Sequence, residues 1–265
     1  MRFDLNHVRC LNNPNFWKPS MILIKSLSFS ILVIALSVAA SSAQNVRKIA
    51  FRTLCLERLA GMEKVAIPGK VPPELQEFEL FTDVSPVIEG VFATGEALFY
   101  IQKPPGLDGK PIHQLVGRGP LAKSNRQLFL FSPGEGGEGK LPYQIWCFDD
   151  DTTNFPMGNV RAINLSPVPV RFILSGKMTP EIPPAKHAYF PHSKKFNDYN
   201  MYPVVVEFLS GNGRWVKGQS VSWKATDRRR EIVVTLIDPR FKQPSVRMYS
   251  DFPPWLETPP TAVTP

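Results

Sequence analysis

Two cysteines are the most reactive side chains in the body of the chain. Cys55 and Cys147 are the only cysteines that follow residue 43. Each shares the alternation of its apolar neighbours, so each thiol is expected on the core-facing side of a strand. In an oxidising compartment the pair could form a disulfide, whose loop of roughly 90 residues corresponds to about 4 to 5 kcal/mol of chain entropy. The alternative is two separate buried thiols that behave as small apolar groups.

Two tryptophans could bind a ligand by stacking. Trp215 and Trp223 share parity in one expected strand, so strict alternation puts both rings on the same face of a sheet. An exposed pair would stack on sugar rings, which predicts carbohydrate binding. The favoured interpretation is that both rings add apolar area to the core, because Ser220 and Ser222 alternate with them along the strand.

Oxygen and nitrogen ligands cluster at two places. Asp149, Asp150 and Asp151 could offer oxygens to Ca²⁺, but their spacing is not that of an EF-hand loop. An acidic linker that ends a strand is the favoured interpretation. His187 and His192 lie in one loop, without the HExxH or paired-cysteine spacing of a zinc site. We therefore assign no metal site and no cofactor.

The sequence patterns of nucleophilic catalysis and of phosphate loops are missing. No Gly-x-Ser-x-Gly frame occurs, and no cysteine stands beside a poised histidine. The glycine-rich stretch SPGEGGEGK over residues 132–140 is followed by Pro142 and another expected strand, whereas a phosphate loop must lead into a helix. Carboxylates are numerous, but sequence alone singles out no pair across a cleft. We assign no catalytic residue, and the chain is expected not to be an enzyme.

The composition indicates a folded protein that does not bind nucleic acid. An apolar share of 43% with 20% charged residues predicts a packed core rather than disorder. The 27 prolines argue against long helices. The formal charge is +8, but apart from Arg228–Arg230 the basic residues are scattered and no basic stretch is interleaved with aromatic residues.

The N-terminus has the pattern of an export signal. The apolar stretch LSFSILVIALSVAA over residues 27–40 follows Lys25 and precedes the small residues 41–43, which is the order of n-region, h-region and cleavage site. We expect cleavage before Gln44, and Met21 is an alternative start. The other interpretation is an uncleaved segment, which would be the chain's single contact with a membrane. The protein is therefore expected to be exported, to the periplasm or the cell exterior.

Short strands joined by turns are expected over the remaining sequence. Period-two alternation recurs between Pro, Gly, Asn and Asp, which predicts an all-β fold of two antiparallel β-sandwich-like units. The runs 203–206 and 232–237 are almost uniformly apolar and are predicted to be central strands covered on both faces. The expected organisation is a signal sequence over 1–43, a first β unit over 44–150, a linker over 151–158, a second β unit over 159–251 and a proline-rich tail over 252–265.

One stretch resembles a known group of proteins. It is VRAINLSPVPVRFILSG over residues 160–176, preceded by Phe-Pro-Met-Gly over 155–158 and followed later by Trp223 and the Arg228–Arg230 run. This arrangement is similar to that of uncharacterised exported β-sandwich proteins of Verrucomicrobia-like bacteria. The resemblance implies a fold, and it supplies no catalytic residue.

These observations favour a non-enzymatic cell-envelope protein, acting as a structural, scaffold or binding module whose partner is an envelope protein or a polysaccharide. The alternative is a secreted hydrolase or its carbohydrate-binding accessory domain. A cleft with convergent carboxylates would favour the hydrolase, whereas a flat face with an unpaired edge or an apolar patch would favour assembly.

Overall fold

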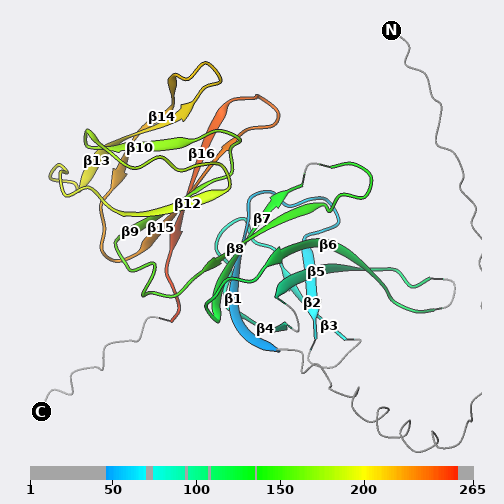
Figure 1. The fold of residues 1–265 in the computed structure, drawn as a ribbon. Coiled ribbons are helices and arrows are strands. Elements are labelled where there is room, and N and C mark those ends of the chain that lie inside the picture. Colours follow the sequence, from blue (N-terminus) through cyan, green and yellow to red (C-terminus); the bar gives the residue numbers. More distant parts are fainter. Residues whose placement is uncertain (1–45, 70–73, 93–94, 107–108, 135, 256–265) are drawn as a thin grey trace, which may run out of the picture. The chain divides into compact units, whose positions relative to one another are not determined.

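The computed structural model describes residues 46–69, 74–92, 95–106, 109–134 and 136–255, in which every regular element is a strand (Figure 1). The expected signal sequence and most of the expected tail lie outside these residues. The part of the chain described here contains no helix with the length and hydropathy needed to cross a membrane. It belongs to one compact unit. The predicted all-β class is confirmed.

The first half of the described chain is a sandwich of two four-stranded sheets, ordered β4-β1-β7-β8 and β3-β2-β5-β6. The facing surfaces share a core in which the ring of Phe129 lies 5.0 Å from that of Phe51 and 5.3 Å from that of Phe99. We call it the first sandwich. Its strands are β1 (Arg47–Cys55), β2 (Lys64–Pro68), β3 (Leu75–Glu79), β4 (Ile88–Phe92), β5 (Glu96–Lys103), β6 (Ile112–Pro120), β7 (Arg126–Pro133) and β8 (Tyr143–Asp149).

The second half is a sandwich of sheets ordered β12-β9-β15-β16 and β11-β10-β13-β14. Its core includes Phe172, Tyr202 and Trp223. We call it the second sandwich. Its strands are β9 (Asn159–Asn164), β10 (Val170–Leu174), β11 (Lys177–Met178), β12 (Lys186–Pro191), β13 (Met201–Leu209), β14 (Trp215–Lys224), β15 (Arg230–Ile237) and β16 (Pro244–Asp251).

A third core joins the two sandwiches. Leu54, Leu128 and Phe148 of the first sandwich form one buried cluster with Ile163 and Ile232 of the second. Strands β1, β7, β9 and β15 are therefore covered on both faces over most of their length. The predicted central strand at 232–237 lies here, in β15. Residues 203–206 also lie in a central strand, since β13 stands between β10 and β14. The prediction that this strand is covered on both faces is wrong, because β13 alternates between buried and more exposed residues and covers the core with one face only.

The two sandwiches have the same topology. Adding eight to each strand number of the first sandwich turns its two sheet orders into those of the second. Each contains one parallel pair, β1 with β7 and β9 with β15, among otherwise antiparallel ladders. The ladder of β5 with β6 and that of β13 with β14 also each contain one register shift. The chain is topologically a tandem repeat of one sandwich.

The strand registers also align individual residues of the two repeats. Arg126 begins β7 and Arg230 begins β15, so we align these two residues. Asp150 lies opposite Arg126 and Asp251 lies opposite Arg230, so Asp150 and Asp251 then occupy matching positions. The parallel ladders then place Arg52 of β1 on Arg161 of β9. Positions matched in this way are called equivalent below.

Candidate functional site

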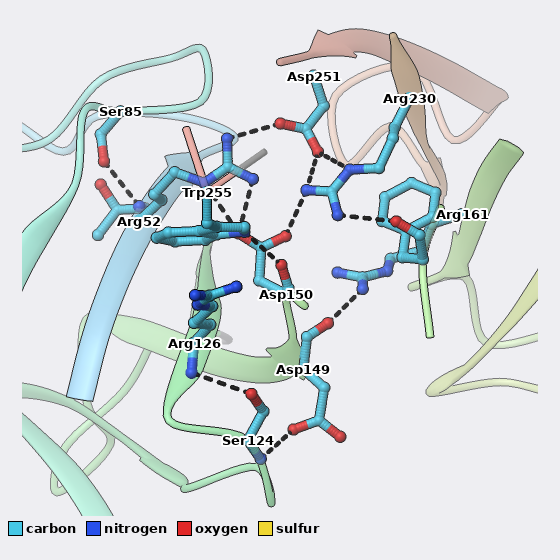
Figure 2. A network of polar contacts seen from close by, with 12 residues as sticks. Arg52, Ser85, Ser124, Arg126, Asp149, Asp150, Arg161, Arg230, Asp251 and Trp255 are labelled. Carbon is cyan, nitrogen blue, oxygen red and sulfur yellow. Dashed lines mark hydrogen bonds and ion pairs between the residues drawn. The ribbon is translucent and has the colours of Figure 1, made fainter. Parts of the chain in front are cut away.

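A buried charge network joins the two sandwiches (Figure 2). We define it as Arg52, Asp150, Arg230 and Asp251, none of which is more than 2% exposed. Arg52 donates to Asp150 at 2.6 and 2.8 Å and to Asp251 at 2.6 Å. Arg230 donates to Asp251 and to Asp150, each at 2.7 Å. Two cations thus face two anions, and each aspartate is shared by both arginines.

The network keeps Arg52 charged despite its burial. Desolvation alone would lower the pKa of Arg52, but the charges and hydrogen bonds of Asp150 and Asp251 outweigh it and raise the pKa above its ordinary value. Because the charges are buried and mutually paired, the network can hold the sandwiches together but offers no open reactive centre.

An aromatic residue from the first sandwich covers arginines of the second. Phe155 follows β8, and its ring centroid lies 4.3 Å from the guanidinium carbon of Arg230 and 4.5 Å from that of Arg161. Its backbone carbonyl accepts a hydrogen bond from Arg230 at 2.9 Å. Arg161 is fully buried and donates to the backbone carbonyl of Asp149. Desolvation lowers the pKa of Arg161, and the ring faces around it supply part of the missing solvation.

Trp255 makes the reciprocal contact. It follows β16 of the second sandwich, and its ring centroid lies 5.2 Å from the guanidinium carbon of Arg52 and 5.6 Å from that of Arg126, both in the first sandwich (Figure 2). Its indole nitrogen donates to the backbone carbonyl of Asp150 at 2.7 Å. An aromatic ring that follows the last strand of each sandwich therefore contacts arginines of the other sandwich. These two contacts stabilise the junction between the sandwiches.

A groove of about 820 Å³ opens at one end of the second sandwich. One wall is the β10–β11 turn with its flanks, residues 174–180, and the other is the segment 190–195 that ends β12. Leu174 and Phe190, each 8% exposed, belong to the second core and contribute to the apolar lining. At the turn, Ser175 donates to the carbonyl of Lys195 at 2.8 Å, which ties the two walls together. We refer to this feature as the groove.

The rim of the groove is positively charged. Lys177, Lys194 and Lys195 line it and are exposed, and none of the residues known to line it is acidic. Lysines above an apolar lining attract an anion that also carries an apolar part. The volume lies in the range of small-molecule and peptide sites.

His192 is a further residue that lines the groove. Its Nδ1 lies 2.7 Å from the hydroxyl of Tyr202, within hydrogen-bond distance. Its Nε2 is buried, with no hydrogen-bond partner in the protein. Desolvation and the charge of Arg229 lower the pKa of His192, so its neutral form predominates at neutral pH.

The proposed disulfide is not formed. Both cysteines are free thiols, with Cys55 buried and Cys147 half-buried. Cys55 lies opposite Phe131 and Cys147 opposite Phe129, so β7 separates the two strands. Two strand spacings place the Cα atoms about 10 Å apart or more, beyond the roughly 7 Å limit for a disulfide. The alternative of two separate thiols describes the structure, and desolvation raises the pKa of both.

The prediction that the two tryptophans share a face is wrong. The ladder pairs Val206 with Gln219 and then Glu207 with Lys217, so a bulge at Gly218 shifts the alternation by one residue. A Cβ at Gly218 would lie 2.5 Å from a ring carbon of Phe208, which explains why glycine occupies the bulge.

Their surroundings consequently differ. Trp223 is 6% exposed and packs in the second core, with its ring 5.9 Å from that of Phe172. Trp215 is half-buried on the outer face, where the guanidinium of Arg171 lies 4.1 Å from its ring centroid and pairs with Glu207 at 2.7 Å. The two rings cannot form one stacking platform for a sugar.

The acidic cluster serves structure. Asp150 lies in the charge network, Asp149 accepts the backbone N–H of Ser124 at 2.6 Å, and Asp151 accepts that of Asn154 at 2.8 Å. The described residues contain no group of three acidic, histidine or cysteine side chains arranged to hold a metal ion.

The charge network and the groove were not predicted from the sequence. Arg52 and Arg161 stand in otherwise apolar runs, at positions whose parity predicts burial, and that placement was the available signal. His187 and His192 do not meet at one site. His187 packs its ring 5.1 Å from that of Phe148, whereas His192 lines the groove.

Comparison with known proteins adds no assignment. No protein-family model matches the sequence, and no curated protein matches it. The function must therefore be argued from the network and the groove.

Proposed function

We propose that this protein is an exported, non-enzymatic binding module of the cell envelope that captures an anionic ligand with an apolar part in the groove. The observation that carries the proposal is the combination of three exposed lysines with an apolar lining. Export is the expectation from the N-terminal sequence pattern.

The architecture supports a binding role. Ser175 donates to the carbonyl of Lys195 and Ser193 donates to Ser175, each at 2.8 Å, so hydrogen bonds join the two walls of the groove in a preorganised frame. A preorganised site loses less conformational entropy when a ligand binds.

The chemistry of the lining favours an anionic, apolar ligand over a neutral sugar. Sugars stack on exposed aromatic faces, but Phe190 is 8% exposed and Trp223 lies in the core. The lysine rim instead selects for a carboxylate, sulfonate or phosphate, and the apolar lining selects for a hydrocarbon part.

The test uses an anionic naphthalene sulfonate dye as the probe, titrated by fluorescence against the processed protein. Replacing Lys177 and Lys194 together by glutamine should weaken dye binding about 3- to 30-fold, because each exposed charge pair contributes roughly 0.3 to 1 kcal/mol. The matched control is Lys217→Gln with Lys224→Gln, which removes two exposed lysines of β14. Equal affinity in wild type, double variant and control would contradict the proposal.

A further inference from the structure

In the first sandwich, the described residues at the place equivalent to the groove are packed closely together. By the strand registers, Gly90 of β4 is equivalent to His192, and Phe92 of β4 is equivalent to Lys194. The cavity at this place in the first sandwich is only about 10 Å³ and is lined by residues that include Gln76, Glu89 and Gly90. The repeat therefore supplies an internal comparison of a filled and an open form of one site.

Phe92 fills the site in the first sandwich. Strand β4 continues along β1 as far as the pair Arg47 with Phe92. The ring of Phe92 is 3% exposed and lies 6.0 Å from that of Phe51 and 6.1 Å from that of Phe129. A Cβ at Gly90 would lie 2.6 Å from the Cδ1 of Ile67, so the close packing depends on glycine.

The second sandwich lacks the ladder pairs that correspond to those of residues 47–49 with β4. Strand β12 ends at Pro191 and β9 begins at Asn159, so the residues equivalent to 47–49 are Pro156, Met157 and Gly158. Pro156 has no N–H to donate to a ladder, and Gly158 has a φ of 73°, outside the extended region. Lys194 stands exposed at the position equivalent to Phe92.

The groove also has an edge that can pair with an extended chain. Leu174 and Lys177 are paired at the turn between β10 and β11. Two residues further along, the N–H of Thr179 donates to the carbonyl of Phe172 at 2.8 Å. Met178 lies between these two hydrogen-bonded positions, so its own N–H and C=O point away from β10. Main-chain groups of this kind bind a peptide by adding it to the sheet.

We propose that the groove binds an extended, acidic and apolar peptide segment of a partner protein. One apolar side chain of that segment fills the place that Phe92 fills in the first sandwich, and its carboxylates meet Lys177, Lys194 and Lys195. The inference rests on the proposed function and names its ligand. Strand β4 itself shows the required pattern, since Glu89 lies three residues before Phe92 and pairs with Lys48 at 3.2 Å.

The experiment uses a fluorescein-labelled peptide of the β4 sequence, VIEGVF over residues 87–92, with anisotropy of the processed protein as the readout. Two further peptides carry alanine in place of the phenylalanine and glutamine in place of the glutamate. We expect the parent peptide to bind, the alanine peptide to bind at least tenfold more weakly and the glutamine peptide about threefold more weakly.

Two variants of the protein test the site. Lys194→Phe should fill the groove as Phe92 does in the first sandwich, reducing peptide affinity at least tenfold without lowering the melting temperature. Lys194→Glu should reduce affinity by charge reversal alone, and it keeps the test valid if the phenylalanine variant misfolds. Lys224→Phe makes the same chemical change at an exposed position of β14 and should leave affinity unchanged.

The outcomes separate the two proposals. Dye binding that depends on Lys177 and Lys194, without binding of any of the three peptides, would overturn the peptide inference and leave the proposed function standing. A wild-type protein that binds neither the dye nor any of the peptides would overturn both. Peptide binding that survives Lys194→Phe and Lys194→Glu would place the peptide elsewhere and overturn the inference.

Discussion

The charge network can be tested by removing one of its four charges. Asp251 is fully buried and accepts hydrogen bonds from Arg52 and Arg230. Asp251→Asn preserves the size of the side chain but leaves two buried guanidinium groups facing a single carboxylate. Breaking a buried ion pair in this way costs about 3 to 5 kcal/mol. For a domain of this size each kcal/mol corresponds to about 2 to 4 °C, so we expect the melting temperature to fall by roughly 6 to 20 °C.

The measurement is urea unfolding followed by circular dichroism, with thermal melting as a second readout. The control is Glu89→Gln, which removes a carboxylate from the exposed Lys48–Glu89 pair, whose side chains are 69% and 60% exposed. That change should stay within about 0.5 kcal/mol. A loss of less than about 1 kcal/mol for Asp251→Asn would show that the network contributes little to holding the sandwiches together, and would refute the reasoning.

Two further predictions concern single side chains. Trp223→Ala should lower the free energy of unfolding by about 3 to 5 kcal/mol, because it opens a cavity in the second core. Trp215→Ala on the outer face should lower it by about 1 kcal/mol or less. Equal losses in urea unfolding would contradict the assigned faces. His192 has a pKa below its ordinary value of 6.5, so as pH falls through that value the unfolded chain binds the proton first and stability declines. His192→Gln should make the decline between about pH 7.5 and 5.5 shallower, and an unaltered slope in that variant would contradict the assignment.

The fold class could be predicted because its signal is local. Period-two alternation and turn residues occur within each strand and need no knowledge of partners. The parallel pairing of β1 with β7 could not be predicted, because it depends on which distant strands meet. The alternation rule itself failed where one residue, Gly218, forms a bulge and exchanges the faces of the strand.

The charge network illustrates what one sequence leaves open. Arg230 belongs to a run of three arginines that suggests a solvated surface, yet its side chain is fully buried. Arg52 and Asp251 are separated by 199 positions in sequence, and no local pattern connects them. An arginine at a core-facing position predicts a buried partner, but it does not identify that partner.

The groove and the junction of the two sandwiches have a common origin in the connection between the repeats. In the first sandwich, residues 47–49 lengthen β1 and allow β4 to cover the end of the core. In the second, the equivalent residues 156–158 directly follow Phe155, whose ring lies over Arg161 and Arg230. Residues 156–158 connect Phe155 at the junction to the start of β9. They therefore do not also lengthen the ladder of β9 with β12. Joining two copies of one sandwich through so short a connection therefore closes the junction and, for the same reason, leaves the end of the second core uncovered.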